Sequence, residues 1–259
     1  MDTDFFQDYF SLDGKIALIT GSSRGLGLAL ADGLARAGAT VVLNGRGRER
    51  LDAAVNGLKE KGLGAHGRSF DVTDGKQVKA SVDEIESEIG PISILVNNAG
   101  IQRRFPLEEF PDKDWQDLID TNLTAAFVVS REVAGYMIKR KQGKIINILS
   151  MQSEVSRETI APYAATKGGL KMLTKGMATD WGKYNIQVNG IGPGYFVTEM
   201  SQPLINNPEF DGWLKKRTPM ARWGDPDELV GTAVFLSSKA SDFITGQAIY
   251  VDGGILATI

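Results

Sequence analysis

Short apolar runs alternate with longer segments of helical periodicity along most of this chain, and this alternation restricts the fold more than any other feature. Runs such as residues 94–97 and 144–148 are almost continuously apolar, which is typical of parallel strands covered on both faces. The alternation predicts βαβ units and a parallel sheet with helices on both of its faces. The expected strands are residues 15–20, 40–44, 65–69, 94–97, 144–148, 187–191 and 247–251.

Helical periodicity and end signals place helices between these strands. The first helix should end at Gly38, because a glycine commonly follows the last helical residue. The second should begin at Thr73 or Asp74 and stop at Gly90-Pro91. The expected helices are residues 26–37, 74–89, 115–140, 163–181 and 226–236.

Residues 194–222 are rich in proline and asparagine and interrupt the alternation before the last helix–strand unit. The segment is too long for an ordinary connection, so we expect a small insertion near the substrate, either a lid or a subdomain. We therefore expect residues 1–259 to form one α/β domain that contains this insertion. A (β/α)8 barrel is an alternative at this length, but it would carry its phosphate site at the last two strands.

Composition excludes several kinds of function. The 259 residues include no cysteine, which excludes disulfides, thiolate catalysis and cysteine-based metal sites. The single histidine, His66, excludes a site of several imidazoles; we expect it to be a partly exposed strand residue, and we expect no metal site. With 29 basic and 32 acidic side chains, the net charge of −3 gives no attraction to nucleic acid or anionic membranes. The acidic start Met1–Asp4 and the lack of an apolar run of roughly 18 residues predict no secretory signal, no membrane span and a cytoplasmic protein.

A glycine-rich turn follows the first expected strand and opens the first expected helix. Gly21 permits a sharp exit from the strand, Gly25 lets the backbone approach a ligand, and Gly27 allows close packing of helix and sheet. Free N–H groups at the helix start could then bind a pyrophosphate. A turn without a ligand is the alternative, but open α/β sheets bind nucleotides at this edge. The residues expected at the phosphate site are Gly21, Ser23, Arg24, Gly25, Leu26 and Gly27.

The end of the second expected strand indicates which dinucleotide is preferred. NAD-selective sites carry an acidic residue here that binds the ribose 2′-hydroxyl, whereas this strand ends in Asn44-Gly45-Arg46. Arg46 and Arg24 could instead pair with a 2′-phosphate, for which a planar guanidinium is suited. We therefore predict NADP(H) as the cofactor, with NAD(H) as the alternative because Glu49 is close in sequence.

Tyr163 and Lys167 lie four residues apart at the start of a long expected helix, so their side chains share one face. A phenol titrates near 10, and a neighbouring ammonium favours the phenolate; lowering the pKa by about 3 units requires about 4 kcal/mol. Solvated helix surface is the alternative for such a pair taken alone. Ser150, however, follows the fifth expected strand at the edge where the glycine turn lies, so one cleft could contain all three side chains.

The order and spacing of these and further motifs resemble the short-chain dehydrogenase/reductase family over essentially the whole chain. The resemblance implies a Rossmann-type, doubly wound sheet of about seven strands, and homotetramers or dimers in which the two long helices pack against a neighbour's. Phe196 and Thr166 depart from the usual family residues without an expected consequence. The matching motifs are the glycine turn, Asp71, Asn97-Asn98-Ala99-Gly100, Asn122, Ser150, Tyr163 with Lys167, and Pro193-Gly194.

The resemblance also implies a role for each matching residue. Tyr163 would be the general acid/base, and Lys167 would lower its pKa and bind the nicotinamide ribose. Ser150 would hold the substrate oxygen, and Asn122 would anchor a water relay behind the lysine. The residues expected around the rest of the dinucleotide are Asp71 and Val72 at the adenine, Asn97, Ala99 and Gly100 at the ribose and phosphates, and Pro193, Gly194, Phe196 and Thr198 at the carboxamide.

Sequences outside the family core resemble the branch of this family that interconverts D-gluconate and 5-keto-D-gluconate. Arg103 and Arg104 follow the fourth expected strand at the mouth of the cleft, where a guanidinium suits a carboxylate. One of the two should face the substrate, and our hypothesis is Arg104; a surface or subunit contact is the alternative. The side chains expected near the sugar hydroxyls are Gln152, Ser153 and Glu154, with Arg157 as a further candidate.

These observations predict an oxidoreductase that transfers a hydride reversibly between NADP(H) and a sugar acid. A reductase of 3-oxoacyl thioesters shares the same motifs and is one alternative, although its acidic carrier protein calls for a basic surface and this chain is mildly acidic. A non-catalytic NADP-binding sensor is another. Such a sensor needs the glycine turn but not the tyrosine, lysine and serine.

Overall fold

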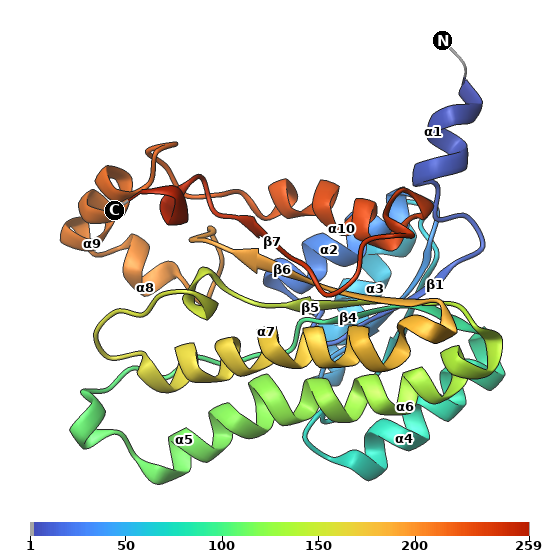
Figure 1. Ribbon diagram of the computed structural model, residues 1–259, viewed down its shortest axis with the longest axis horizontal. Coiled ribbons are helices and arrows are strands. Elements are labelled where there is room, and N and C mark those ends of the chain that lie inside the picture. The colour runs from blue at the N-terminus through green and yellow to red at the C-terminus, as the bar shows by residue number, and fades with distance from the viewer. Residues whose placement is uncertain (1–2, 259) are drawn as a thin grey trace.

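Seven parallel strands form one sheet in the structure, a computed structural model that describes residues 3–258 (Figure 1). The strand order is β3-β2-β1-β4-β5-β6-β7 and every neighbouring pair is parallel, which confirms the predicted doubly wound α/β fold and excludes a closed barrel. Met1 and Asp2 of the acidic start, and Ile259, lie outside the described residues. The strands are β1 (Ile16–Ile19), β2 (Thr40–Asn44), β3 (Ala65–Arg68), β4 (Ile92–Asn97), β5 (Gly143–Ile148), β6 (Ile186–Pro193) and β7 (Ala248–Val251).

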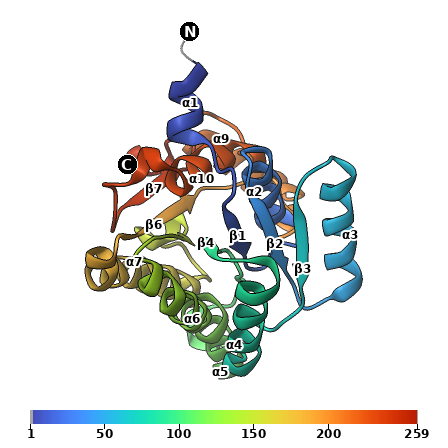
Figure 2. The same ribbon diagram turned by 90° about the vertical axis from the view of Figure 1, so that its right-hand side faces the viewer.

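Helices cover both faces of the sheet (Figure 2). One face carries α2 (Gly25–Arg36), α3 (Arg48–Glu60) and α10 (Val230–Ser237), and the other carries α4 (Gly75–Glu84), α6 (Ala125–Arg140) and α7 (Ala161–Trp181). The remaining α-helices within residues 3–258 are α1 (Thr3–Phe10), α5 (Asp112–Ile119), α8 (Gln202–Ile205) and α9 (Pro208–Arg217). A π-helical turn, Asp120–Thr124, joins α5 to α6, so the predicted helix over 115–140 is confirmed with one irregularity.

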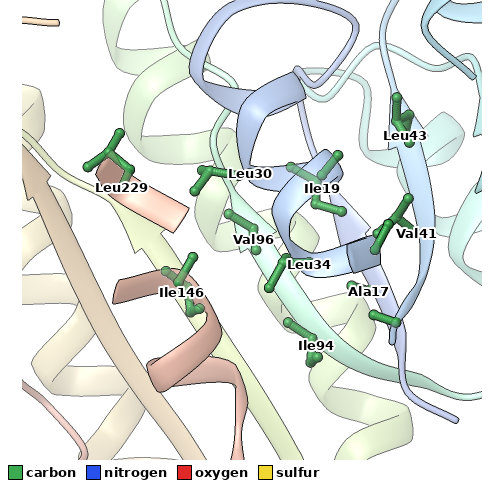
Figure 3. Packing of buried hydrophobic residues seen from close by; sticks show 14 of the residues in the cluster. Ala17, Ile19, Leu30, Leu34, Val41, Leu43, Ile94, Val96, Ile146 and Leu229 are labelled. Carbon is green, nitrogen blue, oxygen red and sulfur yellow. The ribbon is translucent and has the colours of Figure 1, made fainter. Parts of the chain in front are cut away.

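Two apolar layers, one on each side of the sheet, hold these elements together. Ala17 and Ile19 of β1 pack in the same layer as Leu30 and Leu34 of α2, all of them fully buried (Figure 3). Leu18, between them in sequence, belongs to the opposite layer. Each fully buried leucine or isoleucine stabilises the fold by about 1.5–3 kcal/mol. A strand buried on both faces needs apolar residues at every position, which explains the continuous apolar runs.

Several helix ends follow the predicted chemistry. The carboxylate of Asp74 accepts the N–H groups of Lys76 and Gln77 at 2.9 and 3.2 Å and so caps α4. Gly38 follows α2 with φ +106°, and Gly90 ends the π-helical turn after α4 with φ +132°. His66 is an exposed residue of β3, as predicted. Helices α1, α3, α8 and α9 are missing from the predicted set.

Residues 194–222 contain α8 and α9, which lie beyond the carboxyl end of β6 (Figure 1). Leu214 of α9 and Trp223, just after the segment, are buried in a small apolar cluster separate from the two main layers. The segment therefore packs in a small apolar cluster that it shares with Met151, after β5, and with Ile255. None of the helices between residues 3 and 258 is both long and apolar enough to cross a membrane.

Candidate functional site

The carboxyl ends of the parallel strands meet at one edge of the sheet, and a cavity of about 1400 Å³ opens there. Its wall consists of the turn after β1, the segments that follow β2, β3, β4, β5 and β6, and the start of α7. The chain reverses its direction across the sheet between β1 and β4, the point at which open α/β sheets bind ligands. The cavity exceeds the ~1,000 Å³ of a large small-molecule pocket, so it has room for a dinucleotide and a substrate together. Within residues 3–258 no group of three or more Asp, Glu or His side chains is arranged to hold a metal ion.

Most of the residues expected in the site line this one cavity. Four do not: Asn97, Asn122, Ser153 and Glu154. The expected residues in the cavity wall are Gly21, Ser23, Arg24, Gly25, Leu26, Gly27, Arg46, Asp71, Val72, Ala99, Gly100, Arg104, Ser150, Gln152, Arg157, Tyr163, Lys167, Pro193, Gly194, Phe196 and Thr198.

Asn97 lies in the interior instead of in the cavity wall. Its amide nitrogen donates to the Ser130 hydroxyl and to the Asn147 side-chain oxygen, both at 2.8 Å. Its side chain therefore ties β4 to α6 and β5 and does not reach the cavity, so the structure does not support it as a partner of the adenosine ribose. The amide nitrogen takes these two partners because an unpaired polar group in the core is costly, whereas the amide oxygen has no hydrogen-bond partner among residues 3–258.

Asn122 lies behind the cavity in the π-helical turn. Its side-chain oxygen accepts the N–H of Ile101 at 2.8 Å, and its nitrogen donates to the carbonyl of Ile101 at 3.0 Å. The same nitrogen donates to the Thr166 hydroxyl at 3.3 Å. Asn122 thus fixes the loop after β4 against the start of α7, next to Lys167.

Glu154 is also placed differently from the expectation. Its carboxylate pairs with the Lys171 ammonium and accepts a hydrogen bond from the Tyr250 hydroxyl. These hydrogen bonds, together with the opposing effect of burial, leave the pKa of Glu154 below its ordinary value. The side chain is held between α7 and β7, so the structure does not support it as a partner of the sugar hydroxyls.

The glycine turn has the shape required for a phosphate site. Gly21 has φ +61°, and a Cβ on it would lie 2.8 Å from Cα of Ala99. A Cβ on Gly27 would lie 2.6 Å from the Gly21 carbonyl oxygen. Helix α2 has no side-chain cap, so the N–H groups of its first turn are available to an anion at the cavity wall.

Asn44 and Asn98, neither of them expected in the site, hold the glycine turn in place. The Asn44 side-chain oxygen accepts the N–H of Gly21 at 3.1 Å, and the Asn98 amide nitrogen donates to the carbonyls of Thr20 and Gly21 at 3.0 and 2.9 Å. The sequence could have indicated this role by their position, at the end of β2 for Asn44 and just after β4 for Asn98. An asparagine side chain at such a point can form hydrogen bonds with the backbone of a neighbouring loop.

The two arginines expected at the 2′-phosphate are both exposed and both near acids. The Arg46 guanidinium is 76% exposed and lies 3.5 Å from the Asp71 carboxylate, which is too long for a strong pair. Arg24 pairs with Glu199 of the insertion at 2.5 Å, across the mouth of the cavity. Arg46 is therefore the cation that an additional phosphate on the adenosine ribose can engage most easily.

Tyr163 and Lys167 lie one turn apart on α7, with the Lys167 ammonium 5.8 Å from the centre of the Tyr163 ring. The Lys167 nitrogen donates to the Ile148 carbonyl at 2.6 Å, and burial lowers the pKa of Lys167 to about 8. Burial raises the pKa of Tyr163 above its ordinary value, while a hydrogen bond with Ser150 and the charge of Arg104 act in the opposite direction. Desolvation of the phenolate is the largest of these effects, and the expected lowering of this pKa by Lys167 stays a prediction.

Ser150 is almost fully buried at the end of β5 and faces Tyr163. Its hydroxyl donates to the side-chain oxygen of Gln152, and the same oxygen atom of Ser150 accepts the Gln152 N–H at 3.2 Å. Two hydroxyls, those of Ser150 and Tyr163, therefore point at one place in the cavity.

The two adjacent arginines after β4 differ in their partners. Arg103 pairs with Asp114 at 3.1 Å and donates to the Gln102 carbonyl at 3.1 Å. The buried Nε of Arg104 has no hydrogen-bond partner among residues 3–258. Burial, followed by the nearby charge of Arg157, lowers the pKa of Arg104. Both arginines reach the cavity, but Arg104 is the one left in need of an anion.

Comparison with known proteins identifies the family. Residues 15–209 match the family model for short chain dehydrogenase. The chain belongs to the short-chain dehydrogenase family. It is 59% identical to gluconate 5-dehydrogenase of Gluconobacter oxydans strain 621H, over 97% of this chain and 98% of that protein. It is 53% identical to 2-dehydro-3-deoxy-D-gluconate 5-dehydrogenase of Formosa agariphila, over 97% of this chain and 96% of that protein.

A solved structure agrees with this assignment. The crystal structure of a gluconate 5-dehydrogenase from Burkholderia cenocepacia J2315, in complex with NADP and tartrate, superposes with a TM-score of 0.95 at 54% identity. The superposition covers 97% of this chain and 99% of that one. The seven-stranded sheet is therefore that of a short-chain dehydrogenase.

The geometry of this short-chain dehydrogenase suits proton transfer coupled to carbonyl reduction. With a raised pKa, Tyr163 is a neutral phenol at physiological pH and can donate its proton to a developing alkoxide. Ser150 can bond the same oxygen. Lys167, close behind the phenol, stabilises the negative charge that the tyrosine acquires as the proton leaves.

Proposed function

We propose that this protein catalyses reversible hydride transfer between NADP(H) and C5 of D-gluconate, interconverting D-gluconate and 5-keto-D-gluconate. The observation that carries this proposal is half-buried Arg104, whose buried Nε has no hydrogen-bond partner among residues 3–258; it lies beside the Ser150–Tyr163 pair, in the same cavity as the glycine turn. A carboxylate is the natural partner of such a guanidinium. The relatives named above act on sugar acids by their names, which supports the same substrate class here.

The residues present fit a phosphorylated dinucleotide. The first turn of α2 offers N–H groups for the pyrophosphate, and Arg46 lies where the 2′-phosphate of NADP would be bound. Asp71 and Val72 border the adenine side, and Phe196 and the loop after β6 border the other end. The bound cofactor supplies or accepts the hydride. Because the second strand ends without an acid, we propose NADP(H) in preference to NAD(H).

The protein's own part in the reaction is to hold the carbonyl oxygen and to supply a proton. Ser150 and Tyr163 bond the substrate oxygen from two directions, and Tyr163 protonates it as the hydride reaches C5. Lys167 steadies the resulting phenolate. Asn122, through Ile101 and Thr166, keeps the loop and helix that flank this lysine in register.

The substrate class is tested by comparing a sugar acid with an uncharged ketose. Arg104→Ala should raise KM for 5-keto-D-gluconate by about tenfold to hundredfold and change KM for D-fructose much less, since a charged hydrogen bond is lost. Arg36→Ala, an exposed arginine on α2 paired with Asp32, is the matched control and should change neither. Equal effects of the Arg104 substitution on the two substrates would contradict a carboxylate role.

One relative suggests a second candidate substrate. The Formosa agariphila protein is named for 2-dehydro-3-deoxy-D-gluconate, a sugar acid of the same length that is also handled at C5. Measuring kcat/KM for both sugar acids decides between them, with acetoacetyl thioester as the test of the thioester alternative. Higher kcat/KM for 5-keto-D-gluconate than for the other two is expected. Absence of turnover with every substrate would favour the sensor alternative.

We also propose that the enzyme is a homotetramer or dimer that works in the cytoplasm. Trp115 of α5, Phe127 of α6 and Met172 of α7 are large apolar side chains with 43%, 42% and 65% of their surface exposed, which supports burial of this helical layer against a second copy. Sedimentation equilibrium measures the assembly. Cell fractionation tests the location, which is proposed because the reaction draws on NADP(H).

A further inference from the structure

Tyr195 connects the substrate end of the cavity to the insertion. It follows β6 and lines the cavity. Its hydroxyl oxygen receives two donors, Nε of Arg157 at 3.2 Å and Nε2 of Gln152 at 3.4 Å. Gln152 is itself bonded to the hydroxyl of Ser150. One phenol oxygen thus links an arginine of the cavity wall to the serine that bonds the substrate oxygen.

The ring of Tyr195 is fixed by three aromatic side chains. Its centroid lies 5.5 Å from that of Phe210, 6.3 Å from Trp213 and 5.8 Å from Trp223, each in an edge-to-face arrangement. Trp223 is anchored in turn by an indole hydrogen bond to Asp211 at 2.8 Å. The hydroxyl of Tyr195 is therefore held at a definite point by the core of the insertion.

Arg157 is oriented by this hydroxyl, and none of its hydrogen bonds within residues 3–258 goes to a carboxylate. Its Nε donates to Tyr195, its Nη1 donates to the Glu158 carbonyl at 3.2 Å, and its guanidinium lies 5.4 Å from the centre of the Phe210 ring. Its charge is felt at Arg104, whose pKa is lowered by burial first and then by Arg157. Two guanidinium groups in one cavity repel each other until an anion lies between them.

We propose that Tyr195 is a positioning residue that holds Arg157 opposite Arg104, so that the two guanidiniums bind the substrate carboxylate together. Tyr195 would then set the preference for sugar acids over uncharged sugars without itself taking part in proton transfer. This inference rests on the proposed sugar-acid function and adds to it the second cation and the residue that orients it.

The test separates binding from turnover. Dissociation constants of D-gluconate, tartrate and the uncharged D-sorbitol are measured on the full chain loaded with NADPH, which cannot accept a hydride from them. Isothermal titration is used for wild type, Tyr195→Phe, Arg157→Gln and the double variant. Tyr195→Phe keeps the aromatic ring and its packing. Tyr184→Phe, in the short turn that follows α7, is the matched control. Circular dichroism and NADPH affinity report whether each variant is folded.

Tyr195→Phe should weaken binding of both carboxylates about tenfold, which corresponds to about 1.4 kcal/mol, and leave D-sorbitol and NADPH unchanged. In the Arg157→Gln background the same substitution should change carboxylate affinity by less than about twofold, because Tyr195 acts through Arg157. A purely structural role would weaken all three ligands alike. That result, or equal effects of Tyr195→Phe in the two backgrounds, overturns the proposal.

The outcomes also separate this inference from the proposed function. Wild-type protein that reduces 5-keto-D-gluconate, with unchanged carboxylate affinity in Tyr195→Phe, leaves the function standing and refutes the role of Tyr195. Wild type that binds the carboxylates through Tyr195 but does not reduce 5-keto-D-gluconate refutes the function alone. Binding of neither carboxylate by wild type refutes both.

Discussion

Replacing Lys167 by methionine should make the protein more stable while abolishing turnover. Lys167 is only 4% exposed, and its ammonium has the Ile148 carbonyl as its hydrogen-bond partner at 2.6 Å. Burial lowers the pKa of Lys167 from 10.5 to about 8. At about 1.36 kcal/mol per pKa unit, keeping this charge buried at pH 7 costs about 3 kcal/mol. Losing the hydrogen bond to the carbonyl destabilises the variant by about 1–2 kcal/mol. Its net gain in the free energy of unfolding is therefore about 1–2 kcal/mol.

The pH dependence gives the sharper form of this prediction. Because the pKa of Lys167 is lower in the folded protein, the unfolded chain binds more protons between about pH 8 and pH 10.5. Wild type therefore gains stability relative to the methionine variant as the pH rises through this window. The cost of the buried charge should fall by about 1.3 kcal/mol between pH 7 and pH 9. This change does not depend on the value of the lost hydrogen bond.

The measurement is urea unfolding followed by tryptophan fluorescence, at equal protein concentration, without cofactor, at pH 7 and pH 9. Lys59→Met, a change of an exposed lysine on α3, is the matched control and should show a small difference from wild type that is the same at both pH values. A stability difference between wild type and Lys167→Met that does not change with pH would refute the argument. The ammonium would then be protonated to the same extent in the folded and the unfolded protein over this range, which means that burial does not lower its pKa.

Two further predictions concern the chemistry and the cofactor. Tyr163→Phe should bind NADPH with unchanged affinity in a fluorescence titration but lose about 10²- to 10⁴-fold in kcat, the usual contribution of a general acid; a smaller loss would mean that another group supplies the proton. Arg46→Ala should raise KM for NADPH about tenfold and leave KM for NADH nearly unchanged, because only the 2′-phosphate loses a partner. Similar changes for both cofactors in steady-state kinetics would contradict the 2′-phosphate assignment.

Much of the fold can be predicted from the sequence because its signals are local. Continuous apolar runs identify the strands that are buried on both faces. Asp74 marks the start of a helix because its side chain caps nearby backbone N–H groups, and Gly38 marks a helix end because it adopts a positive φ. Helix α3 was not predicted because only three of its residues are buried, in an otherwise polar segment. These residues are Leu51, Val55 and Leu58. Helix α9 buries Leu214 alone, so it has no periodicity to read.

The site residues could be predicted where their roles depend on residues close by in the sequence. They could not be predicted where hydrogen bonds to residues far away in the sequence fix the position of a side chain. Gln152 and Glu154 look equivalent in the sequence, yet Lys171 and Tyr250 draw the Glu154 carboxylate away from the cavity. The Asn97 amide nitrogen likewise donates to partners that lie 33 and 50 residues further along the chain. Tyr195 gave no signal because both of its bonds span about forty residues. Long-range competition for a polar group is invisible until the fold brings the competitors together.

Three cations in the cavity wall, Lys167, Arg104 and Arg157, have no carboxylate partner among residues 3–258. Lys167 is buried against a carbonyl, and Arg104 lies beside Arg157 with its Nε unbonded among the described residues. Each of these charges would be more stable in water than in the cavity, so its position destabilises the folded protein. A bound ligand can remove part of this destabilisation. An anionic substrate at Arg104 lowers this repulsion, whereas an uncharged sugar of the same shape leaves it in place. The preference for the anionic substrate over the uncharged sugar then arises from charge repulsion already present in the unliganded protein. This preference should weaken at high salt, because dissolved anions screen the same charges.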